Sequence, residues 1–397
     1  MPFNSIFSWF IKKRIHQIDL FKTHPDEVQR ELFQELIFKA KTTEFGQKYG
    51  FTDIRSYGDF QRNVPLQDYD DLKPYVDRLM KNEQNLLWPT EIKWFAKSSG
   101  TTNDKSKFIP VSQEAVEDCH FKGGKDLLSI YYNQLPNTKL YKGKNLSVGG
   151  SAEVIDLGNS SYYGDLSAII LKNLPWWAEF RRTPSKKIAL MSEWEEKIEK
   201  MATSTMKEDV SSLAGVPSWT LVLLNKILSI SGASDIKELW PNLEMFMHGG
   251  VSFKPYRSQF ENIISGDMNY IETYNASEGF FGIQDQFNSS ELLLMLDYGI
   301  FYEFIPMTDY EGKDSKKVVT LEDVEPGVNY AVVISTNAGL WRYIIGDTVQ
   351  FSEILPFRFE ISGRTKHYIN TFGEELIVDN AEKAMARACE RTGAKVK

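Results

Sequence analysis

Apolar residues recur at helical spacing in several segments of the chain. Val28, Leu32 and Leu36 fall at near-helical intervals and predict a helix over residues 26–42. Ser192 and Glu195 have the spacing of a capping box and predict that another helix begins there. The same reasoning predicts helices over residues 68–81, 112–132, 220–230 and 381–391.

Short apolar runs that indicate strands lie between these helices. Pro217 argues against a central strand over residues 213–219, because proline cannot donate a ladder hydrogen bond. After Glu291 the strands follow one another directly, which indicates an α/β core with a β-rich section appended. The predicted strands cover residues 145–150, 187–190, 243–247, 270–274, 292–296, 300–305, 330–336 and 340–345.

Composition narrows the function classes. The net charge of −8 over 397 residues argues against nucleic acid as the main partner. Cys119 and Cys389 lie far apart, which indicates a reducing, cytoplasmic location and no zinc site. No run of about 18 apolar residues predicts a transmembrane helix, and residues 1–14 favour an amphipathic helix packed on the body over one that contacts a membrane.

A hydroxyl-rich segment is the first candidate for chemistry. Its donors, followed by Lys105 and Lys107, suit a polyphosphate, which needs many N–H and O–H groups and neutralising cations. A flexible, solvated loop is the plain alternative. The Walker A pattern is absent. The segment consists of Ser98, Ser99, Gly100, Thr101 and Thr102.

Three more glycine-bearing turns follow predicted strands, and in open α/β sheets such turns meet at one edge. Gly249 and Gly250 offer a flat backbone surface for an aromatic base. Ser277 and Glu278 offer a hydroxyl and a carboxylate, and Glu278 is the natural ligand for Mg²⁺. Asp347 can accept two hydrogen bonds from a ribose diol. The turns therefore predict one nucleotide-binding cleft.

These motifs resemble the acyl acid–amido synthetases, which are the plant auxin-responsive "Gretchen Hagen" enzymes and their bacterial homologues, within the adenylate-forming superfamily. The resemblance extends over nearly the whole chain, and the ordered set of motifs carries it. The motifs are Ser98-Ser99-Gly100-Thr101-Thr102, Tyr274-Asn275-Ala276-Ser277-Glu278-Gly279-Phe280-Phe281-Gly282, Trp341-Arg342-Tyr343-Ile344-Ile345-Gly346-Asp347 and Gly363-Arg364-Thr365-Lys366.

The resemblance implies a large N-terminal adenylation domain over residues 1–362, with mixed sheets flanked by helices. Residues 363–397 would be the hinge and the beginning of a small, truncated C-terminal α+β domain. The implied ATP site uses residues 98–102 and Lys105 for the phosphates, Ser277 for phosphate and Glu278 for Mg²⁺. Phe281 would frame the adenine with Gly249 and Gly250, Asp347 would hold the ribose, and Arg364 would approach the ribose or phosphate.

The implied substrates are a carboxylic acid, ATP and an amine such as an amino acid. Two alternatives stay open, which are thioester formation with coenzyme A and nucleotide binding without turnover. His248, beside the glycine pair, is read as structural. The acyl pocket has three candidate wall residues, which are Phe121, Trp176 and Trp177.

Overall fold

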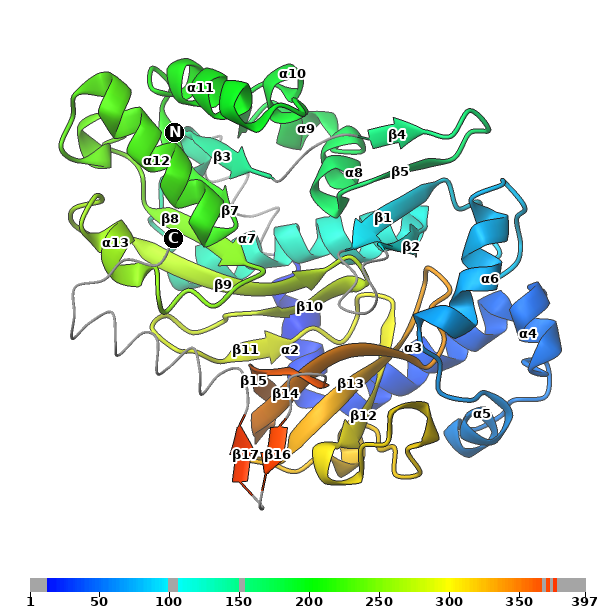
Figure 1. Ribbon diagram of the computed structural model, residues 1–397. Helices are drawn as coiled ribbons and strands as arrows, with labels where there is room; N and C mark the ends of the chain where they lie inside the picture. The colour runs from blue at the N-terminus through cyan, green and yellow to red at the C-terminus, as the bar shows by residue number, and fades with distance from the viewer. Residues whose placement is uncertain (1–12, 99–105, 150–153, 366–368, 372–373, 377–397) are drawn as a thin grey trace.

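One mixed sheet of eleven strands forms the centre of the protein in the computed structural model (Figure 1). The structure describes residues 13–98, 106–149, 154–365, 369–371 and 374–376. In spatial order the strands are β12 (Ile300–Pro306), β13 (Asn329–Thr336), β14 (Tyr343–Ile354), β15 (Phe357–Arg364), β11 (Leu292–Leu294), β10 (Gly279–Ile283), β9 (Asn269–Ala276), β8 (Met245–Gly249), β7 (Val210–Gly215), β3 (Lys144–Val148) and β6 (Arg182–Thr183).

The predicted α/β core and β-rich section are confirmed, and both belong to this one sheet. From β6 to β9 all neighbouring strands are parallel, whereas from β9 to β12 they are antiparallel. A second, smaller sheet has the order β2 (Lys107–Val111), β1 (Trp94–Ser98), β5 (Tyr162–Gly164) and β4 (Val154–Asp156). A two-stranded ladder joins β16 (Ile369–Thr371) and β17 (Glu374–Leu376).

Helices pack on both faces of the parallel part. Leu146 and Val148 of β3 point into an apolar cluster with α11 and α12, while Met245 and Ile271 belong to the larger cluster with α7. Strand side chains alternate between the two faces, so Asn145 and its same-face neighbours lie on the α7 side. The helices on these faces are the π-helix η1 (Ala115–Phe121), α7 (Lys122–Gln134), α8 (Leu166–Lys172), α9 (Trp176–Glu179), α10 (Lys186–Ala189), α11 (Trp194–Thr205), α12 (Pro217–Ser231) and α13 (Arg257–Glu261).

The N-terminal helices support the antiparallel part. Gln29 on α3 donates from Nε2 to the carbonyl oxygens of Leu296 and Ile300, at 2.7 and 3.0 Å, and fixes the helix to the sheet. These helices are α2 (Ile15–Thr23), α3 (Pro25–Ala40), α4 (Glu44–Lys48), α5 (Tyr57–Asn63) and α6 (Tyr69–Leu79). Single 3₁₀ turns are η2 (Leu140–Lys142), η3 (Ile236–Glu238), η4 (Met307–Asp309), η5 (Gly312–Asp314) and η6 (Leu321–Asp323).

The helices predicted over residues 26–42, 68–81, 112–132 and 220–230 are confirmed, the third beginning as the π-helix η1. Three local predictions are wrong. Residues 187–190 lie mostly in the short helix α10. Glu193, not Ser192, precedes the first residue of α11, and it makes no side-chain cap. Pro217 starts α12, where its missing N–H costs no hydrogen bond, so β7 is a central strand after all.

Two predicted helices, over residues 1–14 and 381–391, fall almost wholly outside the described residues. Among the helices that the structure describes, none combines the length and apolar character that crossing a membrane requires. The predicted boundary at residue 363 lies inside β15, and the division into two domains stays a prediction.

Candidate active site

The turn between β9 and β10 carries Ser277 and Glu278 to the edge of the sheet. The pKa of Glu278 is raised to about 7, chiefly by burial and also by the negative charge of Asp347. The backbone N–H of Glu278 and the cations Lys107 and Arg364 act in the opposite direction and limit the rise. The carboxylate is therefore enclosed by charges of both signs and would gain from a further cation beside it.

Asp347 lies on β14 directly across from Arg364 on β15. Its Oδ1 accepts from Arg364 Nε at 2.8 Å, and its Oδ2 accepts from Tyr274 Oη at 2.6 Å. Burial raises the pKa of Tyr274 well above its ordinary value, so the phenol stays a donor. Each carboxylate oxygen has a second lone pair, which leaves Asp347 able to accept from a ribose as well. That role stays a prediction.

Lys107, which the sequence predicts as a cation for phosphate together with Lys105, belongs to this cluster. It stands at the start of β2, in register with Ser98 at the end of β1. Its Nζ donates to Tyr343 Oη at 3.3 Å, and its charge acts on Glu278. Ser98 is half-buried at the same place. Ser99, Gly100, Thr101, Thr102 and Lys105 lie outside the described residues, so their phosphate contacts stay predictions.

The glycine pair at the end of β8 allows β8 and β9 to approach each other closely. A Cβ at Gly249 would stand 2.3 Å from the carbonyl oxygen of Thr273, and Gly250 has a φ of +81°. Both positions therefore require glycine. Phe281 is buried, with its ring centroid 4.7 Å from that of Tyr274. Its predicted contact with adenine is untested, and the ring supports Tyr274 from within the core.

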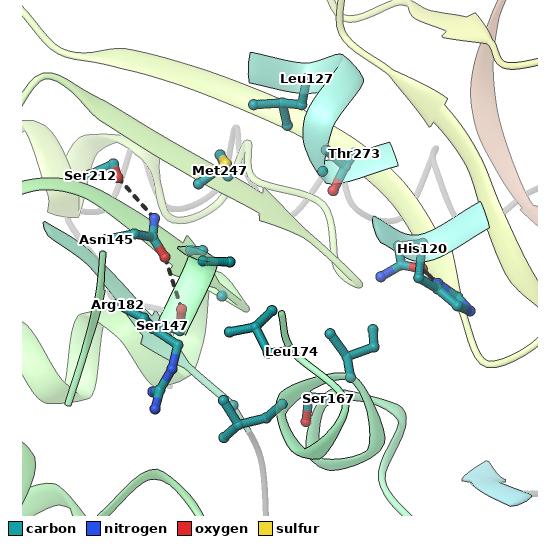
Figure 2. A pocket seen from close by; sticks show the side chains of 18 of the residues that line it. His120, Leu127, Asn145, Ser147, Ser167, Leu174, Arg182, Ser212, Met247 and Thr273 are labelled. Atoms are coloured by element: carbon teal, nitrogen blue, oxygen red, sulfur yellow. Dashed lines mark hydrogen bonds between the residues drawn. The ribbon is translucent and has the colours of Figure 1, made fainter. Parts of the chain in front are cut away.

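A cavity of about 680 Å³ lies between the α7 face of the sheet and helices α7, α8 and α9 (Figure 2). Phe121 and the glycine pair line it. Trp176 is 83% exposed and is not among the lining residues; the Trp177 side chain is not described. Most lining side chains are apolar, among them Leu127, Leu140, Leu171, Leu174, Ala214, Val216 and Met247.

Two histidines line this cavity. Nδ1 of His120 lies 3.1 Å from Asn275 Oδ1, which links η1 to the strand that leads into Ser277. Burial lowers the pKa of His120 to about 4 and that of His248 to about 3, so both rings are neutral near pH 7. His248 stacks on Phe253 with ring centroids 4.2 Å apart, which supports its structural reading. His120 has no partner visible in the sequence, because Asn275 lies far from it along the chain.

The carboxylates of Glu278 and Asp347 fit a magnesium ion that is bound together with a nucleotide. Within the described residues, no group of three or more acidic, histidine or cysteine side chains could hold a metal by itself. Mg²⁺ in nucleotide sites takes one or two carboxylates and fills its remaining positions with phosphate oxygens and water. Glu278, with Asp347 close enough to influence it, is such a partial set.

The fold is that of the adenylate-forming enzymes. Over 96% of this chain it matches a solved structure of GH3.15 acyl acid amido synthetase, with a TM-score of 0.78, 18% identity and 77% of that chain covered. A 2-hydroxyisobutyryl-CoA ligase in complex with 2-HIB-AMP and CoA matches over 89% of this chain and 78% of its own, with a TM-score of 0.59 and 12% identity.

Residues 14–268 match the GH3 family N-terminal domain and residues 293–364 match the GH3 family central domain. The chain belongs to the GH3 family, and the predicted resemblance is confirmed. It is 24% identical to indole-3-acetic acid-amido synthetase GH3.3 of Arabidopsis thaliana, over 85% of this chain and 67% of that protein. It is 27% identical to 4-substituted benzoates-glutamate ligase GH3.12 of the same plant, over 81% of this chain and 65% of that protein. The chain thus spans about two thirds of these relatives.

Proposed function

We propose that the protein is an ATP-dependent ligase that joins a carboxylic acid to an amine. In the first half-reaction, a carboxylate oxygen of the acid attacks the α-phosphorus of ATP, and pyrophosphate leaves. In the second, the amine attacks the acyl carbon, loses a proton and displaces AMP. Neither step needs a nucleophile from the protein, since positioning and charge neutralisation supply the acceleration.

The observation that carries this proposal is that β9 connects an apolar cavity to the charged cluster of Lys107, Glu278, Asp347 and Arg364. Asn275 and Thr273 line the cavity, and the same strand leads within a few residues to Glu278. An acid held in the cavity can therefore present its carboxylate beside the nucleotide site. Membership of a family whose relatives are named amido synthetases supports an amide product.

The proposed nucleotide site combines the described residues with the hydroxyl segment. Ser98 and residues 99–102, with Lys105, bind the phosphates, and Lys107 adds a second cation. Ser277 contacts phosphate, and Glu278 holds Mg²⁺, which when bound shields the charge on the phosphates. Asp347 and Arg364 hold the ribose. The glycine pair after β8 lies against the adenine.

The relatives also suggest the substrate types. Their names include indole-3-acetic acid, benzoates joined to glutamate and, in Nicotiana attenuata, a jasmonoyl group joined to an L-amino acid. We propose an acid with an apolar body and an amino acid as the amine. Two cysteines among 397 residues support a cytoplasmic location.

ATP–pyrophosphate exchange with Mg²⁺, run over a panel of aryl, indole and fatty acids, tests the first half-reaction. We expect exchange that depends on one class of acid. If no acid supports exchange although calorimetry shows that ATP binds, the result would favour a nucleotide-binding protein without turnover. Amine-dependent rather than coenzyme A-dependent release of AMP separates amide from thioester formation. A Glu278→Ala variant should lose exchange most strongly at low Mg²⁺.

A further inference from the structure

The cavity wall carries a row of polar side chains where a sealed core would be apolar. Asn145 and Ser147 of β3 and Ser212 of β7 all line the cavity. Ser147 Oγ donates to Asn145 Oδ1 at 2.8 Å, and Asn145 Nδ2 donates to Ser212 Oγ at 2.9 Å (Figure 2). In the part of the chain that the structure describes, the Ser212 hydroxyl donates to no residue. The row therefore ends in a buried, unused O–H donor.

Arg182 extends this row, because it pairs with Asn145 across β3 and β6. Its side chain is 5% exposed and lines the cavity. Nε and Nη2 donate to the Glu179 carboxylate at 3.2 and 3.0 Å, whereas Nη1 is buried and has no hydrogen-bond partner among the described residues. A buried guanidinium N–H without an acceptor is costly, and an oxyanion would satisfy it.

The other charges on this wall do not supply that oxyanion. Arg181 also lines the cavity. Its buried Nε has no hydrogen-bond partner within the described ranges, although the guanidinium lies over the Tyr141 ring. The carboxylate of Asp165 on the wall interacts with Lys197. Glu179 already occupies one edge of Arg182. This end of the cavity therefore has more guanidinium groups than free carboxylates.

The polar row lies at the other end of the strands from the turn that carries Glu278. Asn145 is in register, through β7 and β8, with Asn269 at the start of β9, whereas Glu278 follows the end of β9. Along β3, Asn145 precedes Gly149 by four residues, and both line the cavity. Four residues of a strand span roughly 13 Å, which an extended chain of roughly ten bonds would bridge. In Figure 2, Arg182 and the polar row lie on one side of the cavity, and His120, whose partner Asn275 leads into Ser277, lies on the other.

We propose that the acid substrate is a long, mainly apolar chain with a second carboxylate at its far end, bound by Arg182 and the Asn145–Ser212 row. This inference rests on the proposed function, because it assumes that the other carboxylate reacts with ATP. The distal group binds equally in the ground and transition states, so it lowers the KM of the acid and leaves kcat unchanged.

Pyrophosphate exchange with a straight-chain monocarboxylic acid of about ten carbons and with the dicarboxylic acid of equal length tests the inference. No amine is present, so every effect concerns the acid. The wild-type protein should have a much lower KM for the diacid than for the monoacid. The difference should exceed the twofold advantage that two equivalent carboxylates give the diacid. Arg182→Gln should raise the diacid KM roughly 10- to 100-fold and leave the monoacid KM unchanged.

Glu179→Gln gives a test with the opposite sign, because it frees the second edge of Arg182 and should lower the diacid KM. Arg62→Gln is the matched control, since Arg62 pairs with Asp59 at the same i,i+3 spacing on exposed α5. Equal effects of Arg182→Gln on both acids, or a wild-type preference for the monoacid, would overturn the inference while leaving the ligase activity established. If no acid supports exchange, the proposed function fails, and calorimetric diacid binding by the wild-type and Arg182→Gln proteins decides the inference separately.

Discussion

Replacing Glu278 by glutamine should stabilise the nucleotide-free protein, and the gain should depend on pH. A pKa raised from 4.5 to about 7 corresponds to about 3 kcal/mol at roughly 1.4 kcal/mol per pH unit. The side chain keeps some contact with solvent, so we expect about 1–3 kcal/mol. For a chain of 397 residues this raises Tm by about 1–4 °C.

The pH window follows from the direction of the pKa shift. Below pH 4.5 the carboxyl is protonated in both the folded and the unfolded protein, and the two proteins should unfold with equal free energies. As the pH rises to about 7, the unfolded state ionises first, so the wild-type protein loses stability that the variant keeps; above pH 7 the difference is constant.

Thermal unfolding of both proteins at pH 4.5 and pH 8 measures this difference. Glu322→Gln, at an exposed position, should show no such pH-dependent gain. Adding ATP with Mg²⁺ at pH 8 should stabilise the wild-type protein more than the variant, because the carboxylate then has its cation. A glutamine variant that is less stable at both pH values, with an unchanged response to ATP and Mg²⁺, would refute the reasoning.

Three further changes test the surrounding structure. Asp347→Asn should weaken ATP binding roughly 10- to 100-fold, measured by calorimetry; an unchanged affinity would remove Asp347 from the site. Arg342→Met leaves the fully buried Glu303 carboxylate without its guanidinium and should lower the free energy of unfolding by about 3–5 kcal/mol, and a loss near zero in a denaturant titration would contradict this. Gly249→Ala forces a methyl group against the Thr273 carbonyl and should cost about 1–3 kcal/mol; an unchanged Tm would show that β8 and β9 separate freely.

The sequence predicts more of the candidate site than of the cavity. Local motifs predict roles for Glu278 and Asp347 because glycine turns at strand ends are visible in a single stretch, and the structure brings these two side chains together. The cavity wall is different, because it is assembled from residues of six strands. Asn145 and Ser212 look like ordinary strand residues until the parallel register places them in one row, and that register is not encoded locally.

Predictions of helix boundaries were wrong where a short-range sequence signal had two possible structural meanings. Pro217 reads as a strand breaker and is in fact the first residue of α12, since proline at that position loses no hydrogen bond. Ser192 and Glu195 have the right spacing for a capping box, yet the helix starts one residue later than that spacing requires. Four-residue helices such as α10 are too short for a periodic pattern.

The Trp341-Arg342-Tyr343 motif shows how core residues position residues of the candidate site. The Trp341 indole donates to the Leu87 carbonyl oxygen at 3.0 Å, and the Arg342 guanidinium binds the buried Glu303 carboxylate at 2.8 Å. Arg342 adopts a φ of +45°, which is unfavourable for a side chain of its size. Two buried anchors on consecutive residues stabilise that backbone, and β14 therefore starts at a fixed position and carries Asp347 to Arg364 and Tyr274.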